Sequence, residues 1–148
     1  MGYMGKILKV NLSKGKISEE PLNMDFAKMF LGGSSLACRI LYDMINKDTD
    51  PLGPENPLIF MTSPLTGTIA PSCGRYVVCA RSPLTGIWGE SNSGGKFGPM
   101  LKFSGFDGII IVGRSEKPVY LSIIDGSAEL RSAEHLVCLL YTSPSPRD

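Results

Sequence analysis

The chain has 148 residues, a length that suits one ordinary domain. Hydrophobic residues make up 43% and charged residues 20%, which indicates a folded globular chain and excludes a disordered one. The 15 Lys and Arg against 14 Asp and Glu leave a net charge of +1, which argues against a nucleic-acid partner. The 17 Gly and 11 Pro predict frequent turns and a close approach of the backbone to a neighbour or ligand.

The two ends and the cysteines narrow the cell compartment and the chemistry. No signal peptide and no membrane-spanning run is predicted, so we expect a cytoplasmic protein with no membrane contact. The four cysteines have no CxxC spacing, and His135 is the single histidine, so no zinc or iron–sulfur site is expected from this chain alone. Cys38 and Cys79 are predicted to be small core residues, and Cys73 lies in a Gly- and Pro-rich loop.

The first third of the chain predicts a hairpin followed by two helices. Apolar and polar residues alternate over 8–12, a turn follows, and 17–20 returns as a second strand. Asn23 is predicted to cap a short helix with Phe26, Met29 and Phe30 on one face, ended by Gly32-Gly33. The next helix is expected to turn four residues inward, namely Leu36, Ile40, Leu41 and Met44.

The middle of the chain holds a verbatim repeat. Ser-Pro-Leu-Thr-Gly occurs at 63–67 and again at 82–86, and each copy predicts a tight turn. A buried strand is predicted at 58–61 and another at 76–80. After the second copy, the run 92–98 (NSGGKFG) leads into a short amphipathic helix that carries Phe97, Met100, Leu101 and Phe103.

The last third repeats the architecture of the first. A buried strand is predicted at 109–112, and a hairpin at 119–131 turns around Asp125-Gly126. Residues 132–135 look like the start of a helix. We therefore predict an α+β fold of duplicated strand-hairpin/helix units in which the second unit is incomplete. The domain is assigned to residues 1–137, and 138–148 reads as the translation of a transposase-type sequencing adapter that is not native.

Two features predict binding of an anion. The turn formed by Asn92, Ser93, Gly94 and Gly95 before a helix suits phosphate, because free N–H groups point at the ligand and glycine permits close approach. The alternative is a helix cap with a tight turn. Arg75 supplies a guanidinium at a strand start, which suits phosphate, or is a solvated charge at the end of a strand.

At these residues the sequence resembles a known family. The two Ser-Pro-Leu-Thr-Gly turns, Gly74-Arg75-Tyr76, the run 92–98 and the run 101–107 (LKFSGFD) are similar to the N-terminal domain of aldehyde ferredoxin oxidoreductases. The resemblance covers residues 3–136. It implies an α+β domain with an internal duplication, which forms the base on which two pterins lie.

The resemblance also implies a cofactor and partners. Family members oxidise aldehydes to carboxylic acids at a tungsten or molybdenum bis-pterin, and pass electrons through a [4Fe-4S] cluster to ferredoxin. Arg75 is expected to contact the cofactor on its cluster side, and Asn92 to offer its backbone carbonyl to a Mg²⁺ ion that joins the pterin phosphates. Gly94 and Gly95 are expected to bind the pterin phosphate. The cluster ligands and the residues that transfer protons are expected outside this chain, so the chain alone is expected to be inactive.

Two other functions remain open at this point. The chain could be a free-standing, non-enzymatic module that binds a phosphate or a pterin and ends near Leu136. It could also come from a paralogue that acts on another carbonyl or acyl substrate, because a fold does not fix a substrate. A homo-oligomer is possible. The sequence does not decide the aldehyde or the metal.

Overall fold

The structure is a computed structural model that describes residues 2–137. The adapter-like segment 138–148 lies outside the described residues, so its assignment stays a prediction. The elements in chain order are β1 (Lys6–Asn11), β2 (Lys16–Pro21), α1 (Met24–Phe30), α2 (Gly33–Met44), β3 (Leu58–Met61), β4 (Tyr76–Arg81), β5 (Trp88–Ser93), α3 (Phe97–Phe103), β6 (Gly108–Val112), β7 (Val119–Ile124), β8 (Ser127–Ser132) and a 3-10 turn (Glu134–Leu136).

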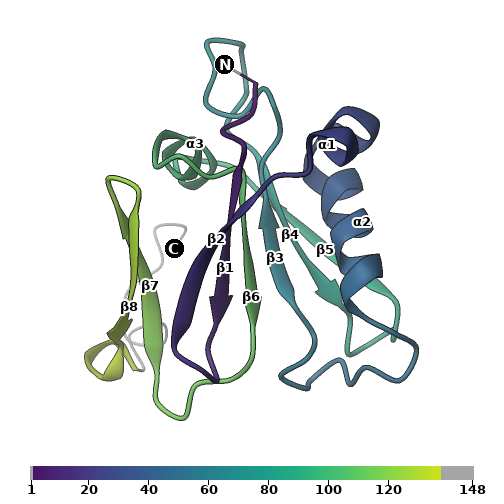
Figure 1. Cartoon of the computed structure of the whole chain (residues 1–148), viewed down its shortest axis with the longest axis vertical. Coiled ribbons are helices and arrows are strands. Elements are labelled where there is room, and N and C mark those ends of the chain that lie inside the picture. The colour runs from purple at the N-terminus through teal and green to yellow at the C-terminus, as the bar shows by residue number, and fades with distance from the viewer. Residues whose placement is uncertain (1, 138–148) are drawn as a thin grey trace, which may run out of the picture.

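Six strands form one mixed sheet in the order β2-β1-β6-β3-β4-β5 (Figure 1). β1 and β6 run parallel, and every other neighbouring pair is antiparallel. β7 and β8 form a separate two-stranded sheet. The predicted α+β class is confirmed, and both predicted hairpins are present. The first hairpin joins the main sheet, whereas the second lies against its face.

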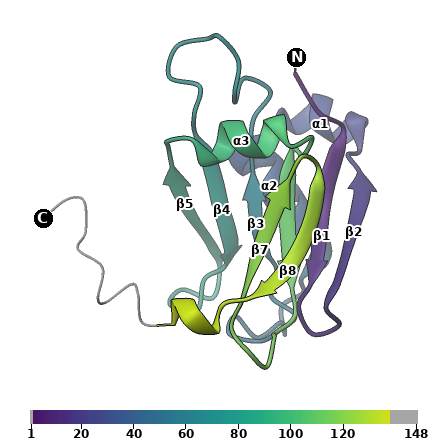
Figure 2. The same ribbon diagram turned by 90° about the vertical axis from the view of Figure 1, so that its left-hand side faces the viewer.

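Both faces of the sheet are packed, which explains the continuous apolar run of β6. Ile110 turns toward α2 and joins a cluster with Ile59, Met61 and Leu36, all less than 5% exposed. Ile109 turns to the opposite face and packs with Leu101 of α3 and with the β7–β8 hairpin. Figure 2 shows that hairpin and α3 on the near side of the sheet and α2 behind it. Alternate residues of one strand therefore serve two cores.

The two predicted helices before β3 are both present. Asn23 Oδ1 accepts the backbone N–H groups of Asp25 and Phe26 at 3.0 and 3.1 Å, which caps α1. In α2, Leu36 and Leu41 are buried as predicted, and Ile40 and Met44 pack at the edge of the same cluster.

One prediction about burial is wrong, and two helices leave large apolar side chains exposed. In α1, Ala27 is buried, whereas Met29 is 72% exposed. In α3, Leu101 is buried, whereas Phe97, Met100 and Phe103 are each more than 40% exposed. Cys38 is exposed on α2, because Ala37 takes the buried position beside it, and only Cys79 is a core residue.

Candidate functional site

The β4–β5 ladder brings the predicted site residues together. Tyr76 pairs with Ser93 at the end of the ladder, so Arg75 and Gly94 lie opposite each other just beyond it. This end of the ladder lies beside α3 (Figure 2). Two residues that are 19 positions apart in sequence thereby meet at one edge of the sheet.

One local expectation at this site is wrong. Asn92 and Ser93 are not in a loop or a helix cap, because they are the last two residues of β5. The N-cap of α3 is Lys96, which makes no side-chain cap hydrogen bond. The sequence hid this strand because Trp88–Ser93 is the polar, mostly exposed edge of the sheet and carries no alternation of apolar residues.

The backbone carbonyl of Asn92 points away from β4. Ser82 donates its backbone N–H to Ile87 O at 2.7 Å, which makes these two residues a hydrogen-bonded pair. Hydrogen-bonded and non-hydrogen-bonded pairs alternate along an antiparallel ladder, and the register continues unbroken to Tyr76–Ser93. The Val77–Asn92 pair is therefore non-hydrogen-bonded. Since β5 is an edge strand, the Asn92 carbonyl oxygen is available to an external ligand.

The side chain of Asn92 is held away from that carbonyl by Glu90. Asn92 Nδ2 donates to Glu90 Oε1 at 2.8 Å, and Ser34 Oγ at the start of α2 donates to the same oxygen at 2.8 Å. Trp88 Nε1 donates to Glu90 Oε2 at 3.2 Å. The hydrogen bonds from Ser34, Asn92 and Trp88 lower the pKa of Glu90, so this carboxylate is ionised near neutral pH. Sequence reasoning missed Glu90, because its partners lie on two different elements.

Close contact between two glycines fixes the turn after β5. A Cβ on Gly74 would lie 2.8 Å from the Gly95 carbonyl oxygen. The loop 62–75 therefore approaches this turn more closely than a residue with a side chain at position 74 would allow. Gly95 has φ +82°, a backbone conformation that favours glycine. Gly94 has open space where its Cβ would be, so a ligand can approach the backbone there.

Two cations flank the turn. Arg75 and Lys96 are both exposed, and within residues 2–137 neither side chain makes a hydrogen bond or a salt bridge. Thr66 Oγ1 donates to the Arg75 carbonyl oxygen at 3.0 Å, which ties Arg75 to the first Ser-Pro-Leu-Thr-Gly turn. The turn thus combines unpaired positive charge with accessible backbone, which suits a phosphate. Lys96 was not singled out from the sequence.

A buried ion pair supports the loop that carries Arg75. Lys102 Nζ lies 2.7 Å from Asp107 Oδ1, and the two side chains are 4% and 3% exposed. The Asp107 carboxylate also accepts the backbone N–H groups of Met4 and Gly5. The Asp107 backbone carbonyl accepts both the N–H and the hydroxyl of Thr62, at the start of the loop. The pair therefore joins the N-terminal segment, α3 and the site loop.

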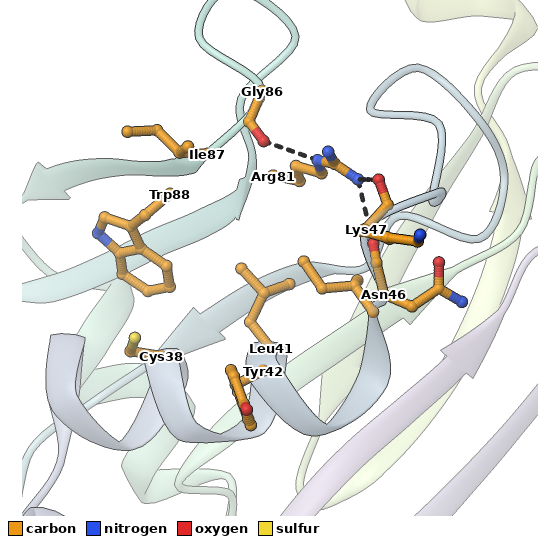
Figure 3. Close-up of a pocket in the computed structure, with 10 residues that line it drawn as sticks. Cys38, Leu41, Tyr42, Asn46, Lys47, Arg81, Gly86, Ile87 and Trp88 are labelled. Atoms are coloured by element: carbon orange, nitrogen blue, oxygen red, sulfur yellow. Dashed lines mark hydrogen bonds between the residues drawn. The ribbon is translucent and has the colours of Figure 1, made fainter.

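A hollow of about 550 Å³ lies at the other end of the β4–β5 ladder, far from Arg75 along the strand. Figure 3 shows Cys38, Leu41 and Tyr42 of α2 on one side, with Ile87 and Trp88 on the other. Arg81 forms the end of the hollow. This hollow shares no residue with the predicted site.

The described residues contain neither a metal-binding cluster nor a membrane-spanning helix. Within residues 2–137, no group of three or more His, Cys, Asp or Glu side chains is arranged to hold a metal ion. In the same part of the chain, no helix has the length and apolar character needed to cross a membrane.

Comparison with known proteins identifies the family. A family model described as "Aldehyde ferredoxin oxidoreductase, N-terminal domain" matches residues 7–142. The chain is 52% identical over 132 residues to the tungsten-containing aldehyde ferredoxin oxidoreductase of Pyrococcus abyssi (strain GE5 / Orsay), a match that covers 89% of this chain and 22% of the relative. It is 39% identical over 134 residues to the aliphatic sulfonate oxidoreductase, WOR-like subunit, of Pyrococcus furiosus, which covers 88% of this chain and 21% of the relative.

A solved structure shares the fold. The active site complex BamBC of benzoyl coenzyme A reductase, in complex with 1,5-dienoyl-CoA, matches with a TM-score of 0.89 and 38% identity. The match covers 92% of this chain and 21% of that one. The chain thus spans about a fifth of the length of the relatives it matches. From the family match and these identities, the chain belongs to the aldehyde ferredoxin oxidoreductase family and corresponds to its N-terminal domain.

Proposed function

We propose that the chain is the N-terminal part of a longer tungsten-dependent (or molybdenum-dependent) aldehyde:ferredoxin oxidoreductase, in which it forms one side of the cofactor site. The 52% identity to a tungsten-containing relative supports the cofactor class. The single observation that carries the proposal is the meeting of Arg75, Asn92 and Gly94 at one end of the β4–β5 ladder. In this proposal the full protein takes an aldehyde and ferredoxin as partners, and the cytoplasm is its expected location.

The residues at this turn fit the phosphate end of a bis-pterin cofactor. The outward carbonyl oxygen of Asn92 is a hard ligand of the kind that Mg²⁺ prefers. Gly94 and Gly95 offer backbone without a side chain in the way, and the free Arg75 guanidinium suits a phosphate or a polarised ring edge. In this proposal the Asn92 backbone carbonyl would bind Mg²⁺, Gly94 and Gly95 would bind a pterin phosphate, and Arg75 would contact the pterin.

Each residue acts by binding or orienting. When bound, the metal–pterin group supplies the two-electron oxidation of the substrate, and a [4Fe-4S] cluster held by residues outside this chain carries the electrons onward. Glu90 keeps the Asn92 side chain on the α2 side of the sheet, so the backbone carbonyl alone faces the cation. The Gly74–Gly95 contact sets the distance between Arg75 and the phosphate-binding turn.

The substrate is the least determined part of the proposal. Relatives carry names for aldehyde, aliphatic sulfonate and glyceraldehyde-3-phosphate oxidation, and the structural neighbour is a benzoyl coenzyme A reductase. This spread favours, as a second candidate, a paralogue with another carbonyl or acyl substrate on the same N-terminal domain.

Three measurements test the proposed function. The source DNA is read beyond codon 137, where continuation into a much longer reading frame is expected, and a native stop codon would support a free-standing binding module instead. The complete protein is then purified without oxygen, and tungsten, molybdenum and aldehyde-dependent viologen reduction are measured. The 148-residue chain is expected to show no viologen reduction under the same conditions.

Arg75 gives the sharpest test of the site. Arg75→Ala in the complete protein is expected to lower the tungsten retained per chain or the rate of electron transfer to viologen. Arg114→Ala is the matched control, because Arg114 follows the C-terminal end of β6, at the opposite end of the main sheet from this turn. Unchanged metal content and unchanged turnover in Arg75→Ala would refute the role given to this residue.

A further inference from the structure

The hollow between α2 and the β4–β5 turn has the character of a protein interface. Tyr42 and Ile87 lie on its two sides (Figure 3). Their side chains are 75% and 69% exposed, and Leu84 in the neighbouring turn is 92% exposed. Leu41 and Trp88 also line it, one from each side. Large apolar side chains gathered around a depression are typical of surfaces that bind another part of a protein.

Arg81 and Lys47 are the two cations that line the hollow, and backbone carbonyls hold the Arg81 guanidinium in place. Arg81 Nε donates to the Gly86 carbonyl at 2.8 Å, and Nη1 donates to the carbonyls of Asn46, Lys47 and Thr49 at 2.7–3.1 Å. These bonds close the end of α2 against the β4–β5 turn. The Arg81 guanidinium therefore serves the fold, and Lys47 is exposed. Because most of the residues that line the hollow are apolar or aromatic, the hollow favours an apolar occupant over a small anionic ligand.

We infer that this hollow receives an apolar side chain, aromatic or aliphatic, from the part of the parent polypeptide that follows this chain. The inference rests on the proposed function, which makes the chain part of a longer protein. More than three quarters of the length of each matched relative lies outside the match, so a large partner surface is available within one polypeptide. A hollow of about 550 Å³ has room for a bulky side chain and its neighbours.

The hollow is also connected to the proposed cofactor turn. Trp88 forms part of its wall and donates to Glu90, and Glu90 accepts the hydrogen bond that orients Asn92. Residues 88, 90 and 92 lie on the same face of one strand. A segment packed against Trp88 would therefore help to fix the position of β5, the edge strand that carries the Asn92 carbonyl. In this way the later part of the parent would stabilise the proposed cofactor turn.

Cys38 reports on the hollow directly, because its exposed thiol lines it. The complete native parent and free glutathione are treated together with N-ethylmaleimide. Mass spectrometry measures the rate at which Cys38 is modified and compares it with the rate for glutathione. Cys38 is expected to react at least tenfold more slowly than glutathione. Ile87→Glu, which puts a charge in the hollow, is expected to raise the rate at least tenfold, whereas Ile87→Leu keeps it slow. Cys79 is buried and must stay unmodified, which verifies that each variant is folded.

The outcomes separate the possible occupants. Modification of Cys38 in the native parent at the rate of glutathione would overturn the inference. Protection that disappears on dilution would assign the hollow to a second copy, and protection that disappears after desalting would assign it to a small ligand, so either overturns it as well. A parent that holds tungsten but leaves Cys38 reactive refutes this inference alone, whereas a native stop codon near residue 137 refutes the proposed function.

Discussion

The Lys102–Asp107 ion pair gives the sharpest prediction about stability. Both side chains are less than 5% exposed, and Lys102 Nζ donates to Asp107 Oδ1 and to the Gly2 carbonyl, each at 2.7 Å. Lys102→Met keeps the length of the side chain and removes the charge. The Asp107 carboxylate then stays buried with only the N–H groups of Met4 and Gly5 to compensate it.

The expected cost follows from this burial. Removing one partner of a buried pair destabilises by about 3–5 kcal/mol, because the other charge is left without compensation. The chain offers a control with the same geometry: Lys6 Nζ also lies 2.7 Å from a carboxylate oxygen of Glu19, but these side chains are 55% and 46% exposed. Lys6→Met is therefore expected to cost about 0–1 kcal/mol.

Urea unfolding of the 148-residue chain, followed by the fluorescence of its single tryptophan, measures both costs. The double variant Lys102→Met/Asp107→Asn completes a cycle with the two single variants, and a coupling of about 1–3 kcal/mol is expected. Equal costs for Lys102→Met and Lys6→Met, or a coupling near zero, would refute the reasoning from burial. If Lys102→Met abolishes folding, the Asp107→Asn variant and the Lys6→Met control still test it.

Three further predictions concern other parts of the molecule. Asn23→Ala removes the cap of α1 and is expected to cost about 1 kcal/mol in the same unfolding assay. Burial, with smaller effects of Glu90 and Cys38, raises the pKa of the Cys79 thiol from 9.0 to about 12. The unfolded chain releases this proton from about pH 9, so the free energy of unfolding should fall toward pH 12 by up to about 1.4 kcal/mol per pH unit, and Cys79→Ala should remove that part of the slope. Gly74→Ala would press against the Gly95 carbonyl and is expected to lower the tungsten content of the parent, whereas Gly2→Ala, with ordinary contacts, should leave it unchanged.

The local pattern of apolar and polar residues was sufficient to predict most strands of the main sheet. β1 and β6 are apolar on one or both faces, and Asn23 is a strong cap, so each could be placed from its own residues. β5 could not, because Trp88–Ser93 is an edge strand whose polar side chains are compatible with a loop, and only its pairing with β4 makes it a strand. The predicted helix α3 is present, but the exposure of Phe97, Met100 and Phe103 could not be predicted, because periodicity identifies an apolar face but not what covers it.

The candidate site, like the sheet, could be predicted only in part from the sequence. Motif similarity picked out Arg75, Asn92 and Gly94, but the sequence alone could not show that β4 and β5 bring them to one place. Glu90 was missed, because its three hydrogen-bond donors become neighbours only after folding. The Lys102–Asp107 pair was missed too, since a spacing of five residues gives no contact on a regular helix and requires the turn that ends α3 at Gly105.

The repeated Ser-Pro-Leu-Thr-Gly motif shows how one local structure serves two ends of the molecule. Both copies turn the chain at a glycine of similar conformation, Gly67 with φ +76° and Gly86 with φ +71°. The first copy lies at the start of the loop to β4, and its Thr66 hydroxyl donates a hydrogen bond to the Arg75 carbonyl at the proposed cofactor turn. The second copy follows β4, and Gly86 offers its carbonyl to Arg81 beside the hollow. The motif determines the turn, and the neighbours of each copy determine its use. Strand β4 lies between them, so the proposed cofactor turn and the inferred docking hollow lie at opposite ends of one strand.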